Sequence, residues 1–179
     1  RFELGDKSPS GRDVLRVEKL AKRFVEKGKP DVQIADDFSL HIMRGDKVAI
    51  IGKSGIGKTS LIKLLLEQLP ADDGKVMWGH ETRVGYFAQD HREGIEEGKP
   101  LWEWMMGLKE DPNRQEIRQL LGRMLFSGEE GEKLTHVLSG GETARLLFAK
   151  LMYLRDNVLI FDEPTNHLDL EAITALRDA

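Results

Sequence analysis

The sequence predicts an α/β fold in which a helical segment is inserted between strands. Two apolar runs, residues 48–51 and 158–161, are continuous and strand-sized, as in strands buried on both faces of a parallel sheet. A glycine-rich loop and an amphipathic helix follow the first run. Between that helix and the second run, residues 101–152 are dominated by helical periodicity. This order is typical of an α/β core that carries a helical subdomain.

Shorter strands are expected before and after the first apolar run. Residues 14–17 form the first of them. In residues 38–43 large apolar side chains recur at every second position, which is the spacing of a half-buried strand, and residues 44–46 then provide a turn. Residues 75–78 and 83–87 are two further short strands.

Four stretches have the apolar spacing of helices. The first runs over residues 61–69 and is ended by Pro70. Residues 101–106 form a short second helix. Residues 117–125 and 144–152 both place apolar side chains at i, i+3, i+4, i+7 and i+8, so each is expected to bury one face.

Composition narrows the class of protein. The 179 residues include 27 basic and 31 acidic side chains, and 40% of the chain is hydrophobic, which suits one packed domain. Cysteine is absent, so disulfides, thiol catalysis and iron–sulfur clusters are excluded.

No stretch approaches the ~20 apolar residues that cross a bilayer, so we expect a cytoplasmic protein without stable membrane insertion. Residues 1–13 are polar and are expected to be a linker or tail.

A phosphate-binding loop is predicted between the first apolar run and its helix, because Gly52 to Thr59 fits the pattern G-x-x-x-x-G-K-[ST]. Glycines let backbone N–H groups turn around an anion, and the helix start adds its positive end. Lys58 can reach the β- and γ-phosphates, and the Thr59 hydroxyl can bind Mg²⁺. The alternative is a turn that only caps a helix. The predicted nucleotide-binding residues of this loop are Gly52, Lys53, Ser54, Gly55, Ile56, Gly57, Lys58, Thr59 and Ser60.

Two carboxylates, Asp162 and Glu163, end the second apolar run. In α/β proteins ligands bind at this carboxyl edge of the strands. Neighbouring residues of a strand point to opposite faces, so Asp162 can hold Mg²⁺ while Glu163 orients or deprotonates an attacking water. The alternative is a solvated acidic pair.

A second helix start that can bind an anion lies at Leu138-Ser139-Gly140-Gly141-Glu142. Ser139 and the N–H groups of Gly140 and Gly141 precede the helix over residues 144–152. On its own this segment could be only an N-cap with an acidic residue in the first turn.

In this order the motifs resemble those of the ATP-binding cassette (ABC) family. Residues 52–59 match its Walker A motif, residues 138–142 its signature and residues 158–163 its Walker B motif. The resemblance implies a P-loop NTPase (ABC ATPase) core with an antiparallel β subdomain and a helical subdomain at about 94–155. The nucleotide-binding domain would cover residues 14–179.

The resemblance also implies roles for single residues. Gln89 lies where the family has its Q-loop glutamine, Phe24 resembles the aromatic residue that stacks on adenine, and Asp169 matches the D-loop. The implied cofactors are ATP and Mg²⁺. The implied catalytic residues are Glu163, Gln89 and Lys58. The implied Mg²⁺ ligands are Thr59, Gln89 and Asp162. ATP held by the partner would be contacted by the signature residues Leu138, Ser139, Gly140, Gly141 and Glu142.

The subclass that the chain most resembles is ABC-F, on the segment Glu-Pro-Thr-Asn-His-Leu-Asp at 163–169 and on Glu142. Within that class, residues 86–91, 101–105 and 121–127 most resemble the YbiT-type branch. That class has two cassettes in one soluble chain, and many members act on the ribosome. Residues 1–13 resemble the end of the linker that enters the second cassette. The family's switch histidine lies on a strand beyond the D-loop, and the sequence stops at Ala179, so we expect a C-terminally incomplete cassette with little activity alone.

In the family, ATP is held between the Walker A face of one cassette and the signature of another. The expected partners are therefore a second cassette, in the same full-length chain or in a homodimer, and the ribosome or RNA through the parent protein. The main alternative is the ATPase subunit of an ABC membrane transporter. The short segment between the phosphate loop and the signature, and the absence of cysteine, argue against a DNA-repair or chromosome ATPase. The presence of Glu163 argues against a module that binds a nucleotide as a clamp without hydrolysing it.

Overall fold

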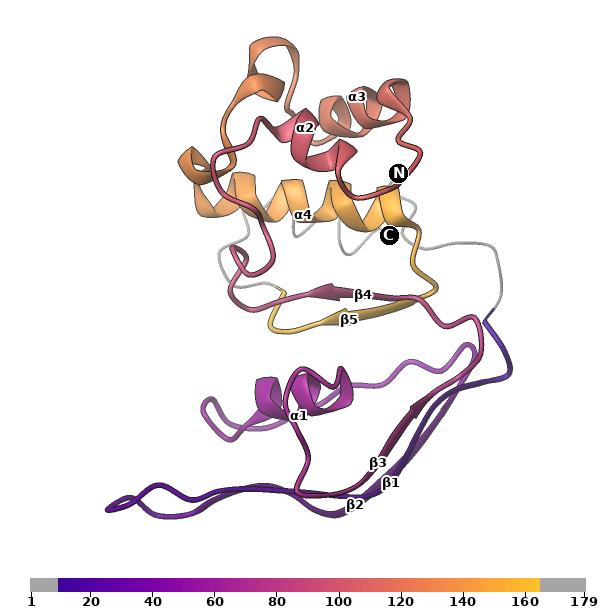
Figure 1. Ribbon diagram of the computed structural model, residues 1–179, viewed down its shortest axis with the longest axis vertical. Helices are drawn as coiled ribbons and strands as arrows, with labels where there is room; N and C mark the ends of the chain where they lie inside the picture. The colour runs from indigo at the N-terminus through magenta and orange to yellow at the C-terminus, as the bar shows by residue number, and fades with distance from the viewer. Residues whose placement is uncertain (1–9, 165–179) are drawn as a thin grey trace. The chain divides into compact units, whose positions relative to one another are not determined.

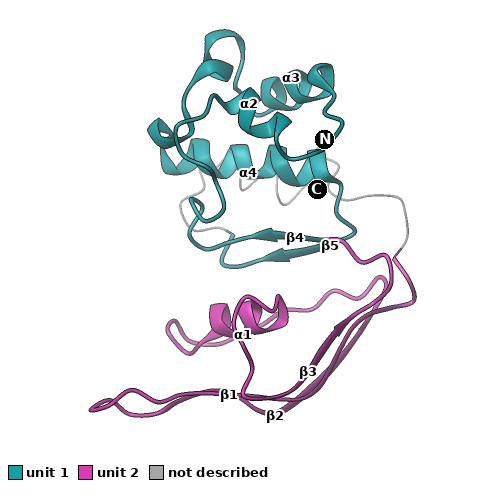
Figure 2. Ribbon diagram, viewed as in Figure 1, with its two compact units in different colours: residues 1–7, 84–179 teal, residues 8–83 magenta. Residues whose placement is uncertain are grey.

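The computed structural model describes residues 10–164, which fall into two compact units. Within the described residues, unit 2 covers 10–83 and unit 1 covers 84–164 (Figure 2). The D-loop residue Asp169, His167 and most of the predicted tail at 1–13 lie outside the described residues. Each unit is built around its own apolar core.

Unit 2 contains a three-stranded antiparallel sheet with the strand order β2–β1–β3 (Figure 1). The strands are β1 (Asp13–Phe24), β2 (Val32–Met43) and β3 (Asp73–Trp78). Helix α1 (Lys58–Leu65) packs Leu64 and Leu65 against Leu15, Val17 and Leu20 of β1. The predicted strands at 14–17, 38–43 and 75–78 are present, and all three are longer than predicted. The helix predicted at 61–69 is also present, but it begins at Lys58 and ends at Leu65, before Leu69 and Pro70.

A bulge in β1 keeps its apolar residues on one face. Val17 and Leu20 are three positions apart, so a regular strand would point them to opposite faces. The register shifts between them, and Lys19 has a φ of 48°. The Lys19 N–H donates to Ser39 Oγ at 3.0 Å instead of continuing the ladder. Both Val17 and Leu20 are consequently buried.

The expectation of a buried strand at residues 48–51 is wrong for the structure described here. The segment has no strand assignment, and Val48, Ile50 and Ile51 are 56%, 41% and 93% exposed. A strand is buried on both faces only when neighbouring strands flank it and helices cover it. The described sheet of unit 2, the unit that contains this segment, is β2–β1–β3 and does not include residues 48–51.

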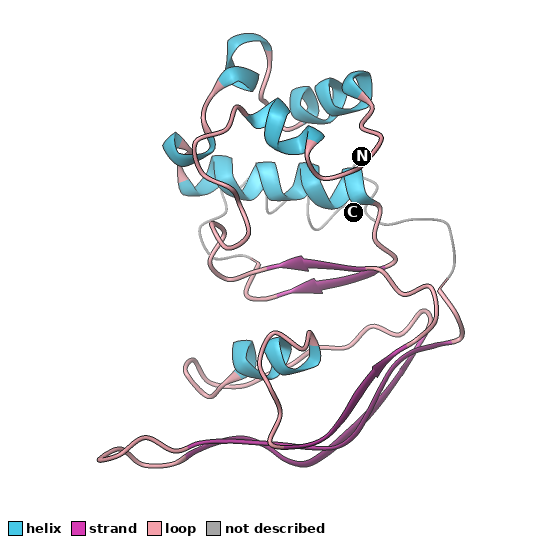
Figure 3. Ribbon diagram, in the orientation of Figure 1, coloured by secondary structure: helices cyan, strands magenta, loops and turns pink. Residues whose placement is uncertain are grey.

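Unit 1 pairs two short parallel strands and contains the helices that lie between them in sequence (Figure 3). The strands are β4 (Val84–Phe87) and β5 (Val158–Phe161), with Phe87 opposite Phe161. Between them in sequence lie α2 (Leu101–Met106), α3 (Arg114–Arg123), α4 (Gly140–Leu154) and two 3-10 segments, η1 (Gly128–Glu132) and η2 (Thr135–Val137). Strand β5 is half-buried, not fully buried as its composition suggested, because within the described residues only β4 pairs with it.

The core of unit 1 lies between α4 and the two strands. Phe87 of β4 is fully buried, and its ring stacks on Phe148 of α4 with centroids 4.9 Å apart. Helices α2 and α3 add Leu101, Met105 and other apolar side chains to the same cluster. The apolar stripe predicted to continue to Leu125 is cut short, because α3 ends at Arg123 and Leu125 has a φ of 65° with a 54% exposed side chain.

Candidate functional site

The predicted phosphate loop is a tight turn before α1 in unit 2. Gly55 and Gly57 have φ values of 77° and 103°, in the left-handed region that glycine tolerates best. Gly57 is the N-cap of α1, so the loop leads directly into the helix start. Lys58 Nζ folds back over the loop and donates to the carbonyl oxygens of Gly52 and Lys53 at 3.2 and 3.1 Å. The loop thus has the backbone curvature and the cation that an anionic ligand needs.

A side chain at Gly57 is opposed by the positive φ and also meets one neighbouring side chain. A Cβ atom built at this position would lie 2.5 Å from Ile34 Cδ1, well inside van der Waals contact. Ile34 belongs to β2 and packs on the core of unit 2. A Cβ at Gly57 would therefore require the end of the Ile34 side chain to move, so the positive φ is the stronger constraint on this position.

Phe24, the predicted adenine-stacking residue, is the last residue of β1 and is 39% exposed. Lys22 Nζ lies 5.5 Å from the centre of its ring. The Asp72 carboxylate accepts from Lys22 Nζ at 2.7 Å and from the Arg23 N–H at 2.8 Å, and these hydrogen bonds lower the pKa of Asp72. The strand end before Phe24 is thereby tied to the segment between α1 and β3.

In unit 1 the predicted residues Asp162 and Glu163 directly follow β5, and Gln89 lies two residues beyond the end of β4. Asp162 is 2% exposed, and its N–H donates to the Phe87 carbonyl at 2.9 Å. Gln89 Nε2 donates to Glu163 Oε2 at 3.2 Å. Glu163 has a φ of 49°, which an L-residue adopts only at some cost and which is common at functional turns. The structure thus brings Gln89 and Glu163 together and buries Asp162 beside them.

Tyr86 is a neighbour of Asp162 that sequence reasoning missed. Its hydroxyl lies 3.5 Å from Asp162 Oδ2. Burial, and then the nearby Asp162 carboxylate, raise the pKa of Tyr86 above its usual value, so the phenol stays protonated and can donate. Tyr86 is on β4 and Asp162 follows β5, so only the strand pairing, which the sequence does not state, reveals the contact.

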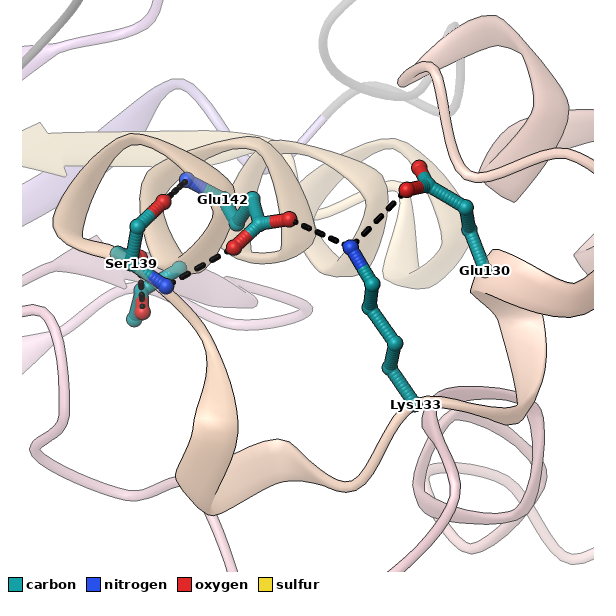
Figure 4. Close-up of polar contacts among 5 residues, drawn as sticks. Glu130, Lys133, Ser139 and Glu142 are labelled. Carbon is teal, nitrogen blue, oxygen red and sulfur yellow. Dashed lines mark hydrogen bonds and ion pairs between the residues drawn. The ribbon is translucent and has the colours of Figure 1, made fainter.

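The signature segment forms the start of α4 and contains a capping box (Figure 4). Ser139 is the N-cap; its Oγ accepts from the Glu142 N–H at 3.3 Å, and its own N–H donates to Glu142 Oε2 at 2.8 Å. Leu138 is buried, and its carbonyl accepts from Arg92 at 3.4 Å. Gly140 and Gly141 form the first turn of the helix.

Lys133 is a second residue of this region that the sequence did not single out. Its Nζ lies 2.8 Å from both Glu142 Oε1 and Glu130 Oε1. Hydrogen bonds from Lys133 and from the Ser139 N–H lower the pKa of Glu142 to about 2. Lys133 and Glu142 are nine positions apart, with η2 and the start of α4 between them, so no helical spacing pointed to the pair.

The predicted site residues fall into two groups, one in each unit. Phe24 and residues 52–60 belong to unit 2. Gln89, Asp162, Glu163 and the signature at 138–142 belong to unit 1. Within each group the chemistry is consistent: unit 2 offers a loop for phosphates, and unit 1 offers a carboxylate with its amide partner and a helix start.

Comparison with known proteins gives consistent results. The family model described as ABC transporter matches residues 35–166. "Probable ATP-binding protein YbiT" of Escherichia coli O157:H7 is 43% identical over 94% of this chain and 31% of its own length. "ABC transporter F family member 5" of Arabidopsis thaliana is 35% identical over the whole chain and 25% of its own length. The chain therefore spans about a third or less of the relatives that it matches.

A solved structure supports the fold. The ATP-binding cassette MJ0796, described as a dimer in a post-hydrolysis state bound to ADP and Pi, has a TM-score of 0.74 at 16% identity, over 92% of this chain and 80% of its own. Within residues 10–164 no helix is both long enough and apolar enough to span a membrane. Because the family model covers most of the sequence, the chain belongs to the ABC transporter family, whose ATPase domains are ATP-hydrolysing P-loop NTPases, and its relatives include ABC-F proteins.

Proposed function

We propose that this chain is an ATP-binding and ATP-hydrolysing cassette of a soluble, cytoplasmic ABC-F protein. The observation that carries the proposal is the contact between Gln89 and Glu163 at the carboxyl ends of two parallel strands. A buried Asp162 lies next to Glu163, and a glycine-rich loop with an inward-folded Lys58 precedes α1. These are the parts that nucleotide hydrolysis needs: a phosphate cradle, a carboxylate for the metal and a base for the water.

The phosphate loop would hold the triphosphate. Backbone N–H groups of residues 52–60 would surround the phosphates, and Lys58 would exchange its two carbonyl contacts for phosphate oxygens. Carbonyl oxygens are weaker partners for an ammonium group than anionic phosphates, so this exchange favours binding. Phe24, partly exposed at the end of β1, would stack on the base.

Mg²⁺ would be held by oxygen ligands, namely the Thr59 hydroxyl, the Asp162 carboxylate and the Gln89 amide oxygen. The donor set suits a hard cation, because all three side chains offer oxygen. The low exposure of Asp162 also favours a metal role, since a buried carboxylate is stabilised by a nearby cation. When bound, Mg²⁺ would supply charge neutralisation on the phosphates.

Glu163 would take the proton of the attacking water. Gln89 donates to Glu163 Oε2, which holds the carboxylate in place for this role. The Gln89 amide is neutral, so it orients the base without adding a charge.

The signature at the start of α4 would bind the γ-phosphate of ATP held by a second cassette, in the same full-length chain or in another copy. A helix start attracts anions, and Ser139 presents a hydroxyl there. ATP would thus join two cassettes, and hydrolysis would release them. We expect a single cassette to hydrolyse ATP slowly.

Action on the ribosome is the role that the ABC-F relationship favours. The ATPase subunit of a membrane transporter is the second candidate, favoured by the family description "ABC transporter". Sedimentation of the intact protein in cell extract distinguishes the two. The ribosomal role predicts ATP-dependent sedimentation with ribosomes, and the transporter role predicts recovery with a membrane permease.

The hydrolytic part of the proposal is tested with Glu163→Gln in the intact protein. Turnover of Mg-ATP should fall by at least about 100-fold, the size expected for loss of a general base, while ATP remains bound. Glu129→Gln removes an exposed carboxylate of η1 and is the matched control. Normal turnover by Glu163→Gln would remove Glu163 as the base.

A further inference from the structure

The capping box of α4 is tied to a neighbouring segment through Lys133 (Figure 4). Lys133 Nζ donates to Glu142 Oε1 and to Glu130 Oε1, each at 2.8 Å. The second oxygen of Glu142 accepts from the Ser139 N–H at 2.8 Å. Lys133 therefore reaches the predicted ATP-contacting residue Ser139 through a single carboxylate.

The position of Lys133 is set by its backbone. Its N–H donates to the Glu130 carbonyl at 3.2 Å, and its carbonyl accepts from the Leu101 N–H at 3.1 Å. The next residue, Leu134, forms an isolated antiparallel bridge with Pro100. The ammonium group thus projects from a segment fixed against the start of α2, and not from a free loop.

The charge of Glu142 is important at this place. A carboxylate in the first turn of a helix is favoured by the partial positive charge of the helix start. The same carboxylate lies where the anionic phosphate of a partner's ATP would come, and it would repel that phosphate unless a cation balanced it. Lys133 supplies the cation, at a side chain that is 35% exposed, while Glu142 is 19% exposed.

We propose that Lys133 is a positioning residue for the signature: it holds Glu142 in the capping box and balances its charge, so that the start of α4 can accept a phosphate. The inference rests on the proposed function, because it requires that the signature receive ATP from a second cassette. Lys133 itself need not contact the nucleotide. Its effect would pass through Glu142 to Ser139.

The test compares Lys133→Met, Glu142→Gln and the double variant in the intact protein. Lys133→Met leaves the Glu142 charge unbalanced, so kcat/KM for Mg-ATP should fall by about 10-fold, the effect of roughly one lost charge-assisted hydrogen bond. Glu142→Gln keeps an oxygen for the Ser139 N–H without the charge. The double variant should therefore recover to within about 3-fold of Glu142→Gln, since the capping box itself then carries no charge to be balanced.

The matched control is Lys99→Met. Lys99 is 38% exposed and pairs with Glu96 at 2.9 Å in the same unit, so it loses a similar ion pair away from α4. Binding of a fluorescent ATP analogue, with no turnover, should be the same for Lys133→Met and Lys99→Met. If Lys133→Met does not fold, Lys133→Gln replaces it and should lower kcat/KM in the same direction.

Two results overturn the inference. In one, Lys133→Met has the kcat/KM of Lys99→Met. In the other, the double variant is as impaired as Lys133→Met, which would mean that Lys133 serves the fold and not the charge of the signature. Failure of the proposed function looks different, because Glu163→Gln would then hydrolyse ATP as fast as the unsubstituted protein.

Discussion

Gln89 and Glu163 are 74 positions apart in sequence, and the Gln89 amide donates to the Glu163 carboxylate at 3.2 Å. The contact follows from strand register. Phe87 and Phe161 are opposite each other in the parallel pair β4–β5, and each functional side chain comes two residues after its phenylalanine. The stacking of Phe87 on Phe148 fixes this pair against α4. A slip of one residue between the strands would separate the amide from the carboxylate.

Gln89→Leu removes this hydrogen bond while keeping a side chain of similar size. We expect kcat for ATP hydrolysis to fall roughly 10-fold, since a hydrogen bond to a charged group contributes about 1.5–3 kcal/mol. KM for Mg-ATP should rise as well, because Gln89 is also one of the three proposed Mg²⁺ ligands. Steady-state kinetics of the intact protein measure both quantities. Gln119→Leu, on the exposed face of α3, is the control, and equal kcat for the two variants would contradict the assignment.

Gly57→Ala and Gly122→Ala should change stability in opposite directions. At Gly57 the positive φ and the contact with Ile34 oppose a Cβ, so the free energy of unfolding should fall by about 1–3 kcal/mol. Gly122 is exposed inside α3, and a Cβ there meets nothing within 4 Å. Alanine should therefore stabilise that helix by up to about 1 kcal/mol. Urea unfolding measures both changes, and a stabilising Gly57→Ala would refute the packing described for the loop.

The ion pair at the signature predicts a pH dependence of stability. The folded-state pKa of Glu142 is about 2, below its usual 4.5, so its contribution is present above pH 4.5 and is lost as the pH falls toward 2. The difference in unfolding free energy between the unsubstituted protein and Glu142→Gln should therefore be constant near neutral pH and shrink across that window. Denaturant unfolding at several pH values measures it, with Glu129→Gln as the control for removal of one charge. A difference that grows on acidification would contradict the capping arrangement.

Much of the fold could be predicted from local patterns in the sequence. Apolar spacing located α2, α3 and α4, because a helix buries one stripe whatever lies far away in sequence. The run at 48–51 failed for the opposite reason. Its composition indicates burial, which only neighbouring strands can provide, and the sheet of unit 2 does not include this run.

The residues of the candidate site likewise differ in whether the sequence could predict them. Motif spacing indicated the phosphate loop and the carboxylates, since those residues are close in sequence. The roles of Tyr86 and Lys133 depend on contacts across 76 and 9 positions, made by strand pairing and by an irregular segment. Such contacts leave no periodic signal, so only the structure reveals them.

Equilibrium binding of a fluorescent ATP analogue in the presence of Mg²⁺ tests most directly whether the loop at residues 52–60 holds a nucleoside triphosphate. Lys58→Ala should weaken binding by at least about 10-fold, because the lost ammonium–phosphate contact contributes about 1.5–3 kcal/mol. Lys75→Met, an exposed position of β3, should bind as the unsubstituted protein does. Equal affinity of Lys58→Ala and Lys75→Met would contradict the account.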